Sequence, residues 1–158
     1  MKGIIHIRID DRLIHGQVAM FWTNELHASR IMVINDEVAN NNMQKSLLRM
    51  AAPSNVATSI ITREKAVENI SAGKYDGQRV LIVVKSPIDI LYLVDHGLEI
   101  RSLNVGNLSG RDHTTSIRQN INVTDEEMSA FKQLLDKGIE ITTVMTPNDA
   151  KTYLKDQL

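Results

Sequence analysis

The feature that most constrains the fold is a regular alternation of apolar runs with amphipathic segments along the whole chain. The clearest run covers residues 79–84, and its near-continuous hydrophobicity is typical of a parallel strand that is buried on both faces. Similar runs predict strands at 4–9, 30–35, 57–62, 100–105, 114–121 and 139–145. Apolar spacing and stop signals predict helices at 16–26, 38–52, 64–72, 88–96, 124–137 and 147–154. Repeated strand–helix alternation implies right-handed crossovers, so we expect a single α/β domain, residues 1–158, with a mostly parallel sheet and helices on both faces.

Composition excludes several functional classes. A formal net charge of −1 argues against a general nucleic-acid binder, and the absence of cysteine removes disulfides, thiolate zinc sites and thiol catalysis. The histidines show no metal-ligand spacing, and no nucleotide-binding signature occurs, so we expect no metal and no cofactor. No stretch approaches the roughly 20 apolar residues that span a bilayer. We therefore expect a soluble, cytoplasmic protein with no direct membrane insertion.

The most unusual local composition lies between the first predicted strand and the first predicted helix. Two arginines, two aspartates and one histidine occur there within eight residues: Arg8, Asp10, Asp11, Arg12 and His15. In open α/β sheets, ligands bind in the crevice outside the carboxyl ends of the strands. A helix that begins there offers free N–H groups and a partial positive charge, which suits an anion. His15 is therefore placed to meet a phosphate.

These residue types are suited to phosphoryl transfer. A neutral imidazole is a nucleophile that can carry a group covalently. Arg8 and Arg12 would disfavour the imidazolium form of His15 and neutralise charge on the phosphoryl oxygens. Asp10 or Asp11 would accept a hydrogen bond from the other ring nitrogen and fix the tautomer. On spacing alone, a histidine at a helix start is more often a cap or a solvated residue, so both interpretations stay open at this point.

Residues 7–18, Ile-Arg-Ile-Asp-Asp-Arg-Leu-Ile-His-Gly-Gln-Val, followed by Trp22, closely resemble the active-site signature of one protein family. The family comprises the IIB components of the mannose/fructose/sorbose class of the phosphoenolpyruvate-dependent sugar phosphotransferase system. The resemblance extends over essentially the whole chain. It implies a phosphotransferase in which His15 is phosphorylated on Nδ1, with Arg8, Arg12 and Gly16 around the phosphate.

The same resemblance implies the partners. The phosphoryl group would come from a phosphohistidine of a IIA domain on a separate chain. It would pass to a sugar held by the membrane components IIC and IID, so the protein would be peripheral to the inner face of the membrane. Mannose, fructose, sorbose and amino sugars all remain open as the sugar.

Polar residues at the ends of other predicted strands form a second group of candidates. We expect them on the same rim as His15, although ordinary turn chemistry explains each one equally well. Lys85 and Arg111 would join Arg8 and Arg12 in a positive rim that faces an acidic partner. The group consists of Asn35, Asp36, Lys85, Ser86, Gly106, Asn107 and Arg111.

Residues 104–107 resemble a family segment that usually reads Asn-Val-Gly-Gly, with Asn107 in place of the second glycine. Asparagine tolerates left-handed backbone, so the loop is expected to survive, while the role of its N–H groups toward the phosphate stays open.

The alternative is a receiver-like signalling module that is phosphorylated on aspartate. Asp10 and Asp11 after the first strand, and Lys85 with Pro87 after a later one, fit such a module. Against it, the third predicted strand ends at 62–64, Thr-Arg-Glu, without an acceptor aspartate. A non-catalytic anion-binding module is the third possibility.

Overall fold

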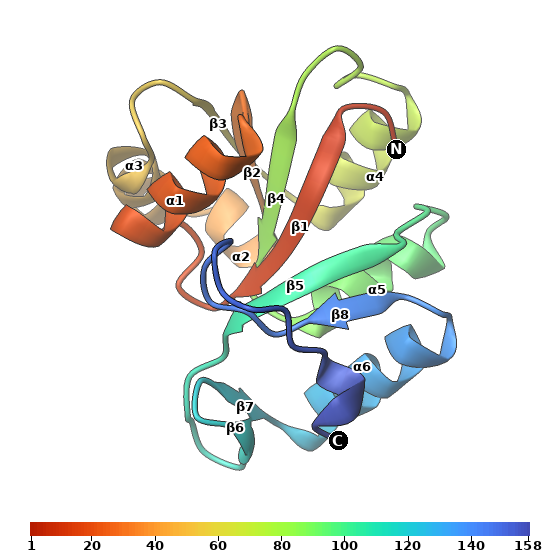
Figure 1. Ribbon diagram of the computed structural model, residues 1–158. Coiled ribbons are helices and arrows are strands. Elements are labelled where there is room, and N and C mark those ends of the chain that lie inside the picture. Colours follow the sequence, from red (N-terminus) through yellow and green to blue (C-terminus); the bar gives the residue numbers. More distant parts are fainter.

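A computed structural model describes all 158 residues and shows one central sheet (Figure 1). Its six strands run in the order β3 (Ala57–Ile61), β2 (Arg30–Ile34), β4 (Val80–Val84), β1 (Ile4–Asp10), β5 (Ser102–Asn107) and β8 (Glu140–Thr142). Every neighbouring pair in this sheet is parallel. The predicted α/β class with a parallel sheet is therefore confirmed.

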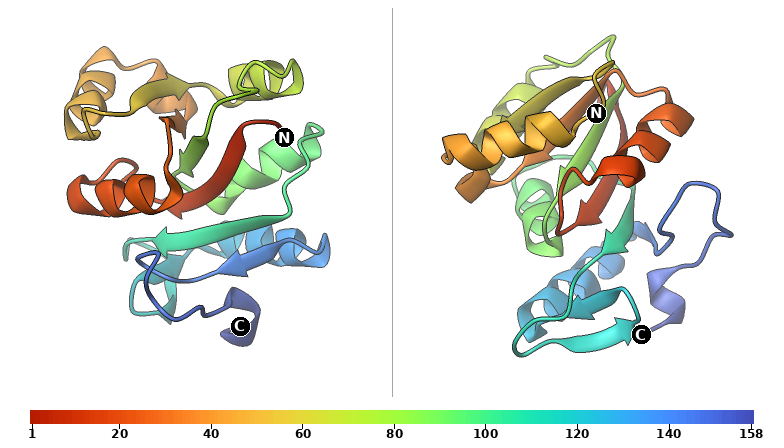
Figure 2. Two further views of the ribbon diagram at one scale, coloured as in Figure 1. Left: turned by 45° about the horizontal axis from the view of Figure 1, so that its top comes forward. Right: turned by 90° about the vertical axis from the view of Figure 1, so that its left-hand side faces the viewer.

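Helices cover both faces of the sheet (Figures 1 and 2). One face packs against α1 (Gly16–Leu26), the short α2 (Asp36–Ala39) and α3 (Asn42–Ala51). The other face packs against α4 (Arg63–Ser71), α5 (Pro87–Asp95) and α6 (Asp125–Asp136).

Strand β4 shows why both faces must be covered. Val80, Ile82 and Val84 belong to the core beneath α4, α5 and α6, whereas Leu81 and Val83 belong to the core beneath α1. Successive side chains of a strand point to opposite faces, so an all-apolar strand needs helices on each side.

Three local predictions were wrong. The helix predicted at 38–52 is interrupted, because Asn40 ends α2 and the Asn41 side chain caps α3 by accepting from the Gln44 N–H. The strand predicted at 114–121 is a separate antiparallel hairpin of β6 (Thr115–Arg118) and β7 (Ile121–Val123).

The helix predicted at 147–154 is mostly a loop that ends in a 3₁₀ turn, Leu154–Asp156. Here the Asp149 carboxylate accepts from the Thr146 N–H, and the hydroxyls of Thr143 and Thr152 lie 2.6 Å apart. These side-chain bonds hold the backbone in a non-helical course.

The fold brings the carboxyl ends of β1, β4 and β5 to one edge of the sheet. The loop that follows β8, drawn in dark blue in Figure 1, runs back across β5 toward α1. Its Val144 and Met145 carbonyls accept hydrogen bonds from Arg8 and Trp22, respectively. Residues from the first and last parts of the chain therefore meet at the end of β1, the strand that leads into the loop carrying His15.

Candidate functional site

His15 lies exposed at the start of α1, where the backbone is unusual. Leu13 has φ of +61°, rare for a branched residue, and Gly16 has φ of +36°. The His15 carbonyl accepts the first helical bonds, from Val18 and Ala19, and its side chain caps nothing. The N–H groups of Gly16 and Gln17 precede those bonds, and no acidic residue occupies the first turn. This helix start therefore presents free donors beside the imidazole, with no competing carboxylate in that turn.

A carboxylate shared by two arginines lies under this loop. Asp10 is 1% exposed and accepts from Arg8 Nη2 at 3.2 Å. Arg12 reaches the same carboxylate with Nε at 2.9 Å and Nη2 at 2.8 Å, and its backbone N–H donates at 3.0 Å. The hydrogen bond that Arg12 donates to Asp10 raises the pKa of Arg12, so this guanidinium stays charged. Nη1 of Arg12 has no partner within the chain.

Arg8 does not reach the surface, since its side chain is only 3% exposed. Its guanidinium lies over the Trp22 ring, 5.1 Å from the centroid, and a methyl added at Gly106 would overlap it. Nη1 donates to Asn104 Oδ1 at 2.6 Å. Burial lowers the pKa of Arg8 to about 10, which still leaves it charged at neutral pH. Direct phosphate contact by Arg8, as the sequence led us to expect, does not fit this geometry, and Arg8 instead holds Asp10.

The predicted orientation of His15 by a carboxylate is also absent. Asp10 bonds to the arginines, and Asp11 accepts from Asn107 Nδ2 at 2.9 Å and from the Ser109 N–H at 2.7 Å. Neither carboxylate contacts the imidazole of His15, which makes no hydrogen bond within the chain.

Asn107 has a role that a glycine could not fill. Its backbone is not left-handed, so the tolerance for that conformation is not used. Its side chain donates to Asp11, and its carbonyl accepts from the Asp11 N–H at 3.0 Å. Asn107 therefore ties the end of β5 to the loop that carries His15.

Only some of the polar residues predicted at the strand ends lie together. A polar hollow of about 240 Å³ is lined by Asp11, Asn35, Lys85, Ser86, Asp89, Arg111 and Glu127. Burial raises the pKa of Asp89 to about 6. Arg111 is paired with Glu127 at 2.8 Å, so it does not extend the positive rim freely, whereas Lys85 forms no ion pair. Asp36 lies outside the hollow and pairs with Arg63 at 3.1 Å.

The sequence reasoning missed Met145, and it gave no role to Trp22 or Asn104, although both lie in the segments that carry the family resemblance. Trp22 is buried and stacks on His6, with ring centroids 4.8 Å apart. Burial lowers the pKa of His6 to about 4, and its Nε2 finds no hydrogen-bond partner. The sequence offered one signal for the buried cluster of Arg8 and Asp10. These two residues alternate with Ile7 and Ile9, which puts the charged pair on one face of β1.

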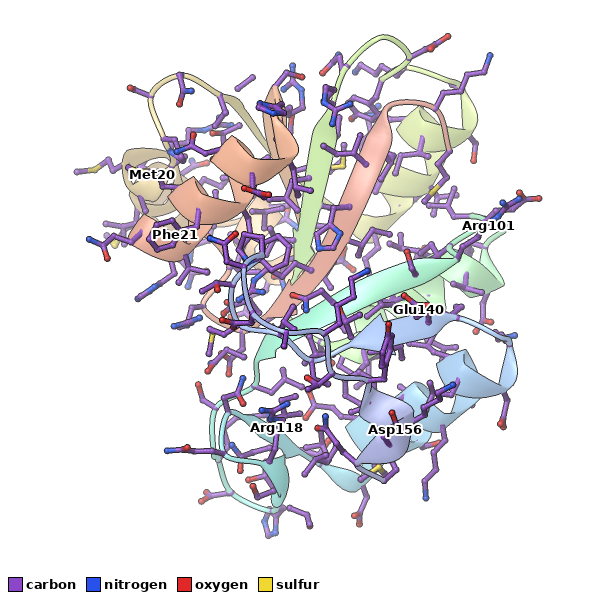
Figure 3. The ribbon with its side chains drawn as sticks, in the orientation of Figure 1. Met20, Phe21, Arg101, Arg118, Glu140 and Asp156 are labelled. Carbon is purple, nitrogen blue, oxygen red and sulfur yellow. The ribbon has the colours of Figure 1, made fainter.

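The outer surface of α1 carries apolar side chains. Met20 and Phe21 are 49% and 51% exposed and project from the helix that His15 begins (Figure 3). On α3, Met43, Leu47 and Met50 are exposed as well. These side chains offer apolar contact area for another molecule.

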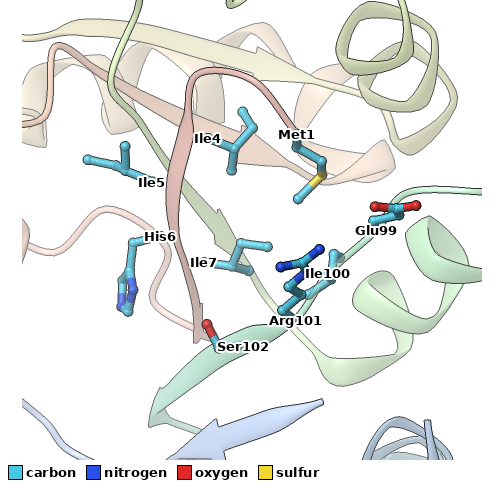
Figure 4. A pocket seen from close by; sticks show the side chains of 9 residues that line it. All are labelled: Met1, Ile4, Ile5, His6, Ile7, Glu99, Ile100, Arg101 and Ser102. Carbon is cyan, nitrogen blue, oxygen red and sulfur yellow. The ribbon is translucent and has the colours of Figure 1, made fainter. Parts of the chain in front are cut away.

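A cavity of about 410 Å³ lies elsewhere, along the first half of β1 and the segment leading into β5 (Figure 4). Its lining includes His6, Glu99 and Arg101, and none of the residues predicted for the site. No group of three potential metal ligands occurs in the chain, and no helix is long and apolar enough to cross a membrane.

Comparison with known proteins places this geometry in a family. A family model described as the PTS system sorbose subfamily IIB component matches residues 4–158. The fructose-specific EIIB component of Bacillus subtilis (strain 168) is 35% identical over 150 residues, which cover 95% of this chain and 92% of that protein.

The mannose-specific EIIAB component of Escherichia coli (strain K12) is 39% identical over 94% of this chain but only 46% of its own length. The chain thus spans about half the length of the mannose-specific relatives it matches. The solved IIBSor domain of the sorbose permease from Klebsiella pneumoniae is 31% identical with a TM-score of 0.93, over 99% of this chain and 96% of that chain. This chain therefore belongs to the sorbose-subfamily IIB components of the sugar phosphotransferase system.

Proposed function

We propose that His15 carries a phosphoryl group on Nδ1 from a IIA phosphohistidine to a sugar presented by the membrane components IIC and IID. The observation that carries this proposal is the exposed imidazole at a helix start with free N–H groups and an anchored arginine nearby. The protein would work at the membrane through these partners.

The transfer exchanges one N–P bond for another. The lone pair of His15 Nδ1 attacks phosphorus, and the donor nitrogen takes back the electron pair of its own N–P bond. In the second transfer the oxygen of a sugar hydroxyl attacks phosphorus, its proton passes to a base on the sugar-binding partner or to solvent, and His15 Nδ1 recovers the electron pair of the broken N–P bond. Since Asp10 and Asp11 do not contact the ring, the required tautomer is set by solvent or by the partner.

Arg12 is the side chain best suited to the phosphoryl oxygens. Asp10 fixes Nε and Nη2, which leaves Nη1 free to bind an anion. A prepositioned cation stabilises charge on the transferring group without reorganising during the reaction. The N–H groups of Gly16 and Gln17 add donors on the same helix start.

Docking must bring two different proteins to His15 in turn. Such encounters are transient and bury less surface than permanent complexes. Phe21 and Met20 supply apolar contact on α1, while Arg12 and Lys85 attract acidic surfaces.

The receiver-like alternative finds little support. Asp10 is buried between two arginines, and both Asp11 oxygens already accept hydrogen bonds from the loop after β5. Strand β3 ends at Ile61 and leads into Thr62, without an aspartate.

The test is phosphoryl transfer from a phosphorylated IIA domain to the wild type and to His15→Gln, Arg12→Ala and Arg49→Ala. We expect acid-labile, alkali-stable label on the wild type and none on His15→Gln. Removing one charge-stabilising donor slows such reactions by roughly 100-fold or more, so Arg12→Ala should transfer slowly. Arg49 is exposed and donates only to the Thr58 carbonyl, so its variant is the matched control. Label on His15→Gln, or alkali-labile label, would overturn the proposal.

A further inference from the structure

Met145, in the loop after β8, lies against the two arginines that share Asp10. Its Sδ is 3.7 Å from Arg8 Nη2 and 3.8 Å from Arg12 Nη2. We infer that Met145 and Trp22 are positioning residues for Arg12, which keep its guanidinium on Asp10 with Nη1 free. The effect of this positioning on catalysis rests on the proposed phosphoryl transfer, whereas the position of Arg12 can be measured whether or not transfer occurs.

Arg12 needs such support because it is partly exposed. Its side chain is 29% exposed, and an arginine in water samples many rotamers. The Asp10 carboxylate fixes one edge of the guanidinium through Nε and Nη2. That ion pair keeps its strength only where water is excluded, and Asp10 is 1% exposed. Something must therefore cover the carboxylate between the two arginines.

A thioether is suited to this cover. It is polarisable and apolar, so it excludes water from the Arg8–Asp10–Arg12 cluster. Its sulfur is only a weak acceptor, and it therefore does not draw the Arg12 guanidinium away from Asp10. Met145 closes the cluster without occupying Nη1.

Trp22 fixes the backbone of Met145. The indole Nε1 donates to the Met145 carbonyl at 3.1 Å, and the ring is 4% exposed between His6 and Arg8. The preceding carbonyl, of Val144, accepts from Asn104 Nδ2 at 3.0 Å. One indole thus anchors the loop and supports Arg8 at the same time.

The rest of the loop is held independently of the site. Arg118 Nη1 donates to the hydroxyls of Thr143 and Thr152 at 3.0 and 3.1 Å. The Asp149 carboxylate accepts from the Thr146 N–H at 3.0 Å, which closes the turn directly after Met145. Truncation of Met145 should therefore leave the course of the loop intact and remove only the thioether.

The first measurement follows the arginine Nε–Hε signals of the unphosphorylated protein by NMR. We compare Met145→Ala, Met145→Leu and Trp22→Phe with Met50→Ala, which truncates an exposed methionine on α3. We expect the Arg12 signal to shift and broaden in Met145→Ala and Trp22→Phe, and to stay close to the wild-type position in Met145→Leu. Arg30 Nε donates to Gln78 Oε1 at 2.8 Å at the start of β2, so its signal is the internal control.

The second measurement is single-turnover transfer from phosphorylated IIA domain. At saturating donor, the transfer rate of Met145→Ala should be roughly tenfold lower than that of the wild type, because Arg12 would regain rotamer freedom and spend less time on Asp10. Trp22→Phe, which loses one hydrogen bond, should be slower by about fivefold. The donor concentration for half-maximal rate should stay within about twofold, since neither side chain is a docking residue in this account. Met145→Leu should restore most of the rate.

Two results would overturn the inference. One is an unchanged Arg12 signal in Met145→Ala and Trp22→Phe, whatever the transfer rate. The other is a wild-type rate in both variants, in a wild type that does transfer. If the wild type shows no transfer but the Arg12 signal moves as expected, the proposed function fails and the positioning of Arg12 is supported.

Discussion

Replacement of Gly106, near the end of β5, by alanine should destabilise this protein strongly. Gly106 has an ordinary backbone conformation, so the conformational freedom of glycine is not what the position requires. The requirement is space, because an added methyl would overlap the Arg8 guanidinium carbon and both terminal nitrogens. Arg8 lies between this glycine and the Trp22 ring and cannot simply retreat.

The size of the effect follows from what Arg8 would lose. Forcing an extra carbon into a filled space costs about 1–3 kcal/mol. Displacing one partner of a buried ion pair costs about 3–5 kcal/mol, because Asp10 would remain buried with weaker compensation. The two costs do not add in full, because moving Arg8 away relieves the steric clash but weakens its ion pair with Asp10. We therefore expect a total loss of about 3–5 kcal/mol in the free energy of unfolding. For a chain of this size, that lowers Tm by roughly 6–20 °C.

The assay is urea unfolding at pH 7, followed by tryptophan fluorescence. Trp22 is the single tryptophan and contacts Arg8 directly, so its emission also reports on the displaced guanidinium. Gly110→Ala, in the loop that follows β5, is the matched control, because the nearest atom to its added methyl is Asn122 Cγ at 3.9 Å. The control should change stability by no more than about 0.5 kcal/mol. A Gly106→Ala loss below about 1 kcal/mol, indistinguishable from that control, would refute the reasoning.

Three further predictions concern titration and docking. Burial lowers the pKa of His6 from 6.5 to about 4, so protonation of His6 destabilises the fold as the pH falls through that window. The wild type should lose about 2–3 kcal/mol of unfolding free energy from this group between pH 6.5 and pH 4. His6→Phe should abolish that loss in urea unfolding. Asp89 has a pKa raised by burial to about 6 from 3.8, so its stabilising contribution is lost as pH rises through that window. The stability of Asp89→Asn relative to the wild type should therefore grow by about 1–3 kcal/mol from pH 4 to pH 7, and a constant difference would contradict it. Phe21→Ser should raise the half-saturating concentration of phosphorylated IIA domain by roughly tenfold with Tm unchanged, because Phe21 is 51% exposed; unchanged saturation would remove Phe21 from the docking surface.

The sheet was predictable because its signals are local. The all-apolar sequence of β4 requires two covering layers, and the chain supplies helices that reach both. The segments that were wrong are those where side chains override pattern. Asparagines at 40 and 41 break one predicted helix, and Asp149 keeps the last predicted helix as a loop.

The site was predictable only along β1 and the start of α1. Arg12 and His15 lie between β1 and α1, as the sequence indicated. The burial of Arg8 could not be predicted, since it depends on the glycine at 106 and on the ring of Trp22. Met145 is 133 residues from Arg12 in the chain, and no local pattern indicates that the two meet.

The central claim is that His15 carries the phosphoryl group, and intact mass tests it most directly. Wild type and His15→Ala are incubated with phosphoenolpyruvate, the general phosphotransferase proteins and a IIA domain. We expect a single acid-labile phosphoryl adduct on the wild type and an unmodified mass for His15→Ala. No adduct with several IIA partners, or an adduct that persists in His15→Ala, would contradict the claim.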